Sequence, residues 1–100
     1  MHGPRDAGTW TSDGRLERRH DILESGRRYR VLREFTDFDG DAHRAGEEWT
    51  FLGSNFVPYE DGLSLFVSKD GVSEWQIRTQ WRAEAQGPVL DRLDAYVGPA

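Results

Sequence analysis

The sequence predicts a mainly β protein: a small SH3-like barrel or roll of four to five short antiparallel strands, capped by one C-terminal α-helix. Large apolar residues alternate with polar ones between Tyr29 and Trp81, as they do in half-buried strands. Turn signals rich in Gly and Asp separate the alternating stretches. The spacing of the apolar residues becomes helical after Pro88. A chain of 100 residues has the usual size of one domain, so we expect a single core.

Residues 1–25 contain few large apolar side chains, and we expect them to form a flexible or partly helical leader. Glycine and proline residues disfavour regular structure in the first ten positions. Leu16 and Leu23 would share one face of a short helix that ends before Gly26, because glycine commonly follows the last residue of a helix. We therefore place the folded domain at residues 26–100.

Four stretches have the period-2 pattern of strands that bury one face. They begin at Tyr29, Trp49, Leu63 and Trp75. The pair Asp70-Gly71, between the last two stretches, is a strong short signal for a β-hairpin turn. In the last stretch, Trp, Ile and Thr alternate with Gln and Arg, so this strand should have the clearest inner and outer faces. Short antiparallel strands at this spacing usually form a small barrel or roll.

The C-terminal segment has the spacing of an amphipathic helix over residues 88–97. Its apolar positions are Val89, Leu90, Leu93, Tyr96 and Val97. Pro88 suits the first helical position, where its missing N–H is not needed, and Gly98 ends the pattern. We expect this helix to lay its apolar face over one opening of the barrel.

Three parts of the chain resemble a known family. These are residues 35–40, residues 46–59, and the pair formed by residues 62–67 with 75–78. Their strings Phe-Thr-Asp-Phe-Asp-Gly, Gly-Glu-Glu-Trp-Thr-Phe-Leu-Gly and Gly-Leu-Ser-Leu-Phe-Val are similar to a small bacterial family described as a domain of unknown function, DUF3601. The resemblance covers about residues 27–97. It implies a compact bacterial domain and brings with it no activity, cofactor or catalytic residue.

Composition and charge favour a cytoplasmic protein that avoids nucleic acid and membranes. The net charge is −5, the sum of +2 over residues 1–30 and −7 over residues 31–100, and it repels phosphates, so a basic partner fits better. The chain has no cysteine, which is consistent with a reducing compartment. It has no apolar stretch near the ~20 residues of a membrane span and no apolar core of a secretory signal.

The sequence lacks the residue patterns typical of catalytic sites. No serine lies in a Gly-x-Ser-x-Gly setting, and no glycine-rich loop precedes a helix. Neighbouring carboxylates such as Glu47 and Glu48 would point to opposite faces of a strand and do not form an acid/base pair. We expect no enzymatic activity and no cofactor.

The acidic loop after Phe35 allows a second interpretation, a small-ligand or divalent-metal-binding barrel. Asp39, Asp41 and His43 are its weak candidate ligands. A calcium loop of the EF-hand type, counted from Asp37, needs glycine at its sixth position, whereas Gly40 is at the fourth. We favour a polar turn that binds no metal, with a solvent-exposed histidine.

Our preferred interpretation of function is a non-enzymatic module that binds a protein or peptide, preferably a basic one. Aromatic residues in loops, beside acidic ones, can anchor such a ligand. The expected binding residues are Asp37, Phe38, Asp39, Asp41, Phe56 and Tyr59. The alternative for the aromatic rings is that they pack beneath their own loops. The size and charge also allow an acidic immunity or antitoxin-type inhibitor, and we expect a monomer or a homodimer.

Overall fold

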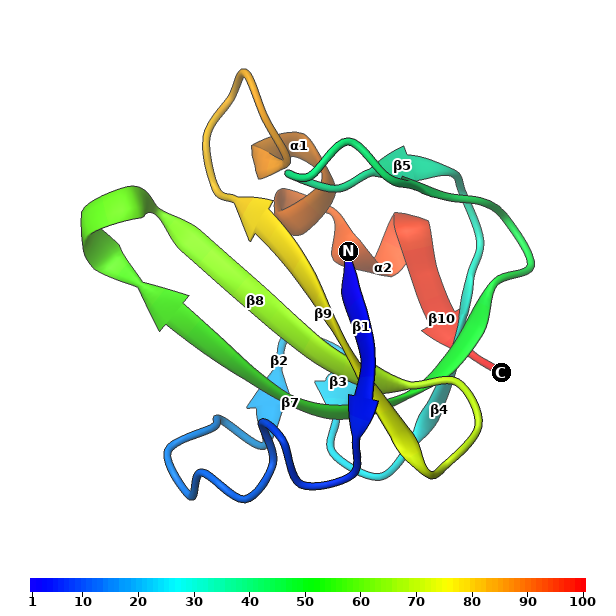
Figure 1. Cartoon of the computed structure of the whole chain (residues 1–100). Helices are drawn as coiled ribbons and strands as arrows, with labels where there is room; N and C mark the ends of the chain where they lie inside the picture. The colour runs from blue at the N-terminus through cyan, green and yellow to red at the C-terminus, as the bar shows by residue number, and fades with distance from the viewer.

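The computed structural model describes all 100 residues and shows a mainly β fold, as expected (Figure 1). The elements, in chain order, are β1 (His2–Asp6), β2 (Arg19–His20), β3 (Leu23–Glu24), β4 (Arg28–Val31), β5 (Phe35–Thr36), β6 (Ala42–His43), β7 (Glu48–Val57), the 3₁₀ turn η1 (Pro58–Glu60), β8 (Gly62–Ser68), β9 (Ser73–Gln80), α1 (Gly87–Asp91), α2 (Leu93–Tyr96) and β10 (Val97–Pro99). Neither helix has the length and apolarity needed to cross a membrane.

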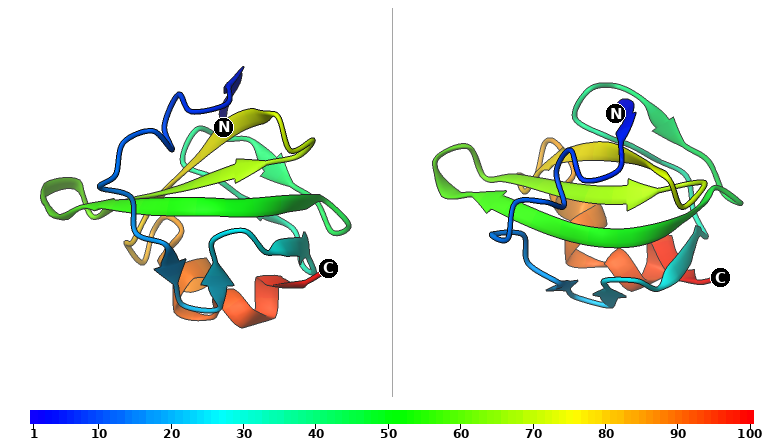
Figure 2. Two further views of the ribbon diagram at one scale, coloured as in Figure 1. Left: turned by 90° about the horizontal axis from the view of Figure 1, so that it is seen from below. Right: turned by 60° about the horizontal axis from the view of Figure 1, so that its bottom comes forward.

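Six strands form one antiparallel sheet in the order β1-β9-β8-β7-β4-β10. Two hairpins of very short strands, β2-β3 and β5-β6, flank it. The expected closed barrel is not present: β1 and β10 are the two edge strands, and no pairing joins them. The helices with β2 and β3 lie on one side of the sheet, and the N-terminal segment lies on the other (Figure 2). We call these sides the inner and the outer face.

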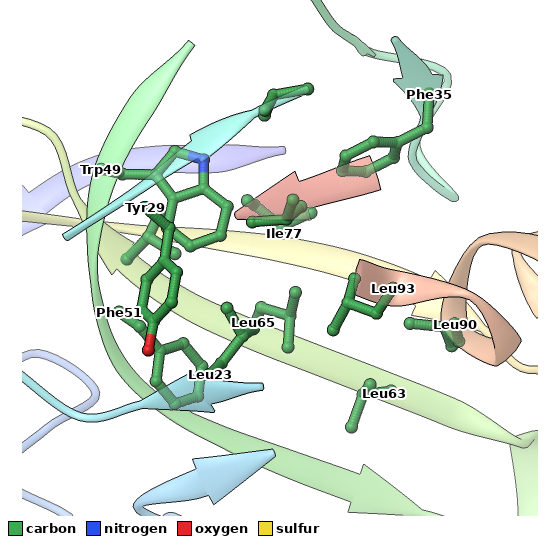
Figure 3. Close-up of a cluster of buried hydrophobic side chains, with 13 residues drawn as sticks. Leu23, Tyr29, Phe35, Trp49, Phe51, Leu63, Leu65, Ile77, Leu90 and Leu93 are labelled. Carbon is green, nitrogen blue, oxygen red and sulfur yellow. The ribbon is translucent and has the colours of Figure 1, made fainter. Parts of the chain in front are cut away.

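The hydrophobic core fills the space between the inner face and the helices (Figure 3). Strands β7, β8 and β9 each supply alternating buried residues, among them Trp49, Leu65 and Ile77. Leu90 and Leu93 come from the two helices and complete the cluster. Removing one such aliphatic side chain from water contributes about 1.5–3 kcal/mol, so the alternation noted in the sequence is the main source of stability.

The expectation of one continuous helix over residues 88–97 is wrong. The chain forms α1 and α2, which are separated at Arg92, whose backbone is not helical (φ −131°, ψ 44°). Val97 then becomes extended and starts β10, which pairs with β4. The open edge of β4 offers backbone hydrogen bonds that a third helical turn would leave unused. The apolar positions at Leu90, Leu93 and Val97 still face the core.

The helix expected in the leader is also not present. Residues 13–25 contain β2 and β3 in place of a helix, and Leu23 is fully buried in the core. Leu16 packs against Gly53 of β7, where an added Cβ would lie 3.1 Å from the Cβ of Leu16. Tertiary contacts with β7 therefore decide the conformation of a segment whose local sequence is ambiguous.

Candidate functional site

The acidic loop between β5 and β6 is shaped by one of its three aspartates. The side chain of Asp37 accepts hydrogen bonds from the backbone N–H groups of Asp39 (2.9 Å) and Asp41 (3.0 Å). Gly40 adopts a positive φ of 87°, which an L side chain rarely tolerates. The loop is thus the polar turn that the sequence analysis favoured, in which an aspartate satisfies loop amides.

His43 is not solvent-exposed as expected but fully buried beneath this loop. Its Nε2 lies 2.7 Å from Asp37 Oδ2, and its Nδ1 lies 2.6 Å from Glu47 Oε2. The imidazole also stacks on the ring of Phe35, with 4.9 Å between ring centroids. The loop histidine is buried because two carboxylates and an aromatic ring supply every contact that water would otherwise make.

These contacts shift the pKa values of all three ionisable groups. Burial alone would lower the pKa of His43, but hydrogen bonds to Glu47 and Asp37 outweigh it and raise the pKa. Burial alone would raise the pKa values of Asp37 and Glu47, but the hydrogen bond to His43 helps to lower both. Both ring nitrogens thus face carboxylate oxygens, an arrangement that favours a buried imidazolium between two carboxylates.

We expect stability to fall as the pH rises above neutrality because of His43. With its folded pKa raised, its contribution is complete below the ordinary histidine pKa of 6.5 and is lost as the pH rises through the folded value. The contributions of Asp37 and Glu47 are complete above 4.5 and are lost as the pH falls through their lowered values. The free energy of unfolding, measured by urea denaturation, should be largest between pH 4.5 and pH 6.5 and lower at pH 8.

The control for this pH dependence is a His43→Ala variant studied over the same range. His20, whose pKa is lowered by burial, acts in the opposite direction in both proteins, so the difference between the two curves isolates His43. The difference should shrink as the pH rises through the folded pKa of His43. A difference that stays constant from pH 6 to pH 9 would contradict the buried imidazolium.

The alternative metal site is not assembled. No group of three or more His, Asp or Glu side chains is arranged to hold a metal ion. Both ring nitrogens of His43 are taken by Asp37 and Glu47, whereas Asp39 and Asp41 face the α-ammonium of Met1 at 3.2 Å and 2.6 Å.

The acidic wall expected to meet a basic ligand already has cationic partners within the chain. The Met1 ammonium lies between the carboxylates of Asp37, Asp39 and Asp41. Arg78, on β9, makes a two-pronged contact with Asp39, at 2.9 Å and 3.2 Å. Burial alone would raise the pKa of Asp39, but these cations lower it. Asp41 stays the most exposed of the three carboxylates.

A pocket of about 200 Å³ lies on the outer face of the sheet beside this loop. Phe38 and Val57 are its two apolar lining residues, and they are 44% and 40% exposed. Polar side chains of the three central strands, Asn55, Ser64, Gln76 and Gln80, also line it. The guanidinium group of Arg78 lies 5.4 Å from the centre of the Phe38 ring and completes the wall nearest the loop.

The other two aromatic residues expected at the site lie elsewhere. Phe56 alternates with Asn55 and Val57 along β7, so it points to the inner face, where its ring contacts Trp81 edge-on. Tyr59 lies in η1 at the tip of the β7-β8 hairpin and is almost fully exposed. Of the three predicted rings, only Phe38 lines the pocket.

The strand residues that form the pocket were not among the predicted site residues. The alternation of the last strand assigned Gln76, Arg78 and Gln80 only to its outer face. Their alternation was the available signal, because it places all three on one face. What the sequence does not show is that the β5-β6 loop lies against this strand, where the N–H of Phe38 donates to the carbonyl of Arg78 at 2.8 Å.

An open antiparallel sheet with short helices on its inner face and a polar pocket on its outer face defines a small β domain. The sequence model of the family "Domain of unknown function (DUF3601)" matches residues 16–98. The chain belongs to this family, as the resemblance of its motifs implied.

A solved structure from Vibrio cholerae is similar to this protein in both sequence and fold. It is described as an integron cassette protein, VCH_CASS4, from the mobile metagenome of that organism. The two share 42% sequence identity with a TM-score of 0.81, over 85% of this chain and 93% of the other. No curated protein sequence matches the chain.

Proposed function

We propose that the protein is a non-enzymatic interaction module that binds a peptide segment of a basic protein partner. The observation that carries this proposal is the outer-face pocket, where two half-exposed apolar side chains, Phe38 and Val57, flank polar strand residues. Concave sites with apolar walls and a few placed polar groups are typical of ligand binding. The setting we propose is the bacterial cytoplasm, with the protein a monomer or a homodimer.

The chemistry of the pocket suits one apolar side chain of a peptide together with its flanking backbone. The ring of Phe38 and the methyl groups of Val57 provide apolar contact. The amides of Asn55 and Gln80 can both donate and accept hydrogen bonds, which matches a peptide backbone. The net charge of −5 would speed the approach of a basic partner.

The proposal is tested by selecting peptides from a displayed library on the native protein and measuring their affinities for two variants. Phe38→Ala should weaken binding at least about tenfold, because aromatic anchors at interface centres contribute most of the binding energy. Phe56→Ala is the matched control, because it removes an equally exposed ring from the opposite face. It should leave the affinity within about twofold.

Two outcomes would contradict the proposal. One is that selected peptides bind Phe38→Ala as tightly as the native protein. The other is that both variants lose binding equally while their melting temperatures match that of the native protein. In either case the pocket would not be the binding surface.

A further inference from the structure

Residues 1–12, which we call the strap, first extend the sheet at the β9 edge through β1 and then cross its outer face (Figure 2). None of them is buried, although they run along β9 and past Phe66 of β8. The family match begins at residue 16, so the strap lies outside it, whereas the strands beneath the strap lie inside it. The strap therefore lies outside the matched residues and covers a surface that they form.

One carboxylate beneath the strap accepts four hydrogen bonds from it. Glu74 of β9 accepts from the backbone N–H groups of Gly8 (2.7 Å), Trp10 (2.9 Å) and Thr11 (3.3 Å), and from the Thr11 hydroxyl (2.6 Å). Burial alone would raise its pKa, but these donors lower it. The side chain of Glu74 has no partner outside the strap, so it acts as a receptor for the N–H groups of a crossing segment.

The start of the strap adds a strand to the edge of the sheet. β1 pairs antiparallel with β9, with His2 opposite Gln76 and Asp6 opposite Ser73. A Cβ at Gly3 would lie 2.8 Å from the carbonyl oxygen of Glu74 and 2.9 Å from the Trp75 ring, so no other residue fits there.

The N-terminal ammonium group, two residues before Gly3, also contacts the protein. The α-ammonium of Met1 lies among the carboxylates of the β5-β6 loop, closest to Asp41 at 2.6 Å. The occupant of this surface thus has three recognisable features. It is an extended strand, it has a glycine against Trp75, and it carries a cation two residues before that glycine.

We infer that the β9 edge, with Glu74 and the β5-β6 loop, is a docking site for an extended peptide segment of the form cation-x-Gly, and that the strap occupies this site in cis. This site goes beyond the proposed function, since it adjoins the pocket at Phe38 without depending on it. A segment without buried residues is held by hydrogen bonds, ion pairs and a few surface contacts such as that of Trp10 with Phe66, so it opens locally at lower free energy than the core unfolds. A peptide of matching chemistry adds a strand in its place.

The test uses the full-length chain carrying Gly3→Val, which forces the strap off Trp75, and a synthetic peptide of residues 1–12 labelled at its C-terminal end. Fluorescence anisotropy should show that the variant binds this peptide at least about tenfold more tightly than the native chain does, because the native strap competes. Two control peptides should bind at least about tenfold more weakly, one carrying Gly3→Val and one acetylated at its α-amino group.

A second measurement does not depend on any variant. Hydrogen exchange of the native chain should show the amides of Gly8, Trp10 and Thr11 exchanging on the order of 100-fold faster than the buried amides of β8. Exchange of both sets at one common rate would make the strap part of the cooperative core and would overturn the proposal. Absence of peptide binding to a folded Gly3→Val chain would overturn it as well.

The same assay separates this site from the pocket. Adding Phe38→Ala to the Gly3→Val chain should leave binding of the strap peptide within about twofold, because the Phe38 ring lies against Arg78 and the contacts that hold the strap are made by other residues. A large loss in the double variant would show that the two surfaces are one and would contradict a separate site. If the double variant loses binding of the library-selected peptides but still binds the strap peptide, only the pocket is affected. That result supports two separate sites.

Discussion

His43→Ala should lower the free energy of unfolding by about 3 kcal/mol or more, the largest effect expected of any polar substitution in this protein. The imidazole is fully buried and bonded on both sides, so its removal leaves the Asp37 carboxylate buried without its closest partner. It also removes the 2.6 Å contact between His43 Nδ1 and Glu47 and leaves a gap beside the Phe35 ring. Urea denaturation at pH 6 measures the loss, and the melting temperature should fall by more than about 10 °C.

The matched control is His2→Ala. His2 also lies near a carboxylate, 3.2 Å from Asp39, but about half of its side chain is exposed. Such surface pairs contribute between about 0 and 1 kcal/mol. If the two substitutions lower stability by similar small amounts, His43 does not hold the loop to the core, and the buried network described above is wrong.

Leu93→Ala should lower the free energy of unfolding by about 2–5 kcal/mol. Leu93 is 1% exposed and lies in the core cluster opposite the inner face of the sheet (Figure 3). Its truncation removes apolar contact and leaves a cavity that the two short helices on either side of Arg92 cannot close without moving. The measurement is denaturation by urea, with the slope of the transition checked for two-state behaviour.

Leu32→Ala makes the same chemical change at a site that is 52% exposed, and it should cost less than about 1 kcal/mol. The contrast between the two leucines tests the assignment of α1 and α2 as the cover of the core. Equal losses would mean that the helices do not pack there, and that the sheet is stabilised by other contacts.

The sequence predicted the central strands well because their physical cause is local. Alternation of apolar and polar residues arises in any sheet that buries one face. Strands β7, β8 and β9 form such a sheet, and they bury Trp49, Leu65 and Ile77. Barrel closure was not predictable, since it depends on whether β1 and β10 meet, and neither strand has a periodic pattern of its own. The break at Arg92 likewise arises because the chain end pairs with β4.

The candidate site was predicted in part for similar reasons. Phe38 was identified because an aromatic residue in an acidic loop can anchor a ligand, and it does line the pocket. Asp37, Asp39 and Asp41 look alike in sequence, but only Asp37 turns inward to a histidine. That difference comes from the packing of His43 on Phe35, a contact between the two short strands β5 and β6. The sequence of neither strand contains a pattern that predicts this contact.

The strap was missed because its attachments are all long-range. Glu74 is separated by more than 60 residues from the amides it binds, and those amides belong to a segment with no apolar pattern. A propensity-based interpretation of residues 1–12 therefore sees only glycine, proline and polar residues. The fixed contacts arise because β9 would otherwise end the sheet with unpaired backbone groups, and β1 pairs with them.

The most direct test of the outer face as the binding surface is an NMR titration of the native protein with a library-selected peptide. Chemical-shift changes should concentrate on Phe38, Val57, Ser64 and Arg78, which surround the pocket. Changes concentrated instead on the ring cluster of Phe56 and Trp81, on the inner side of the sheet, would contradict it.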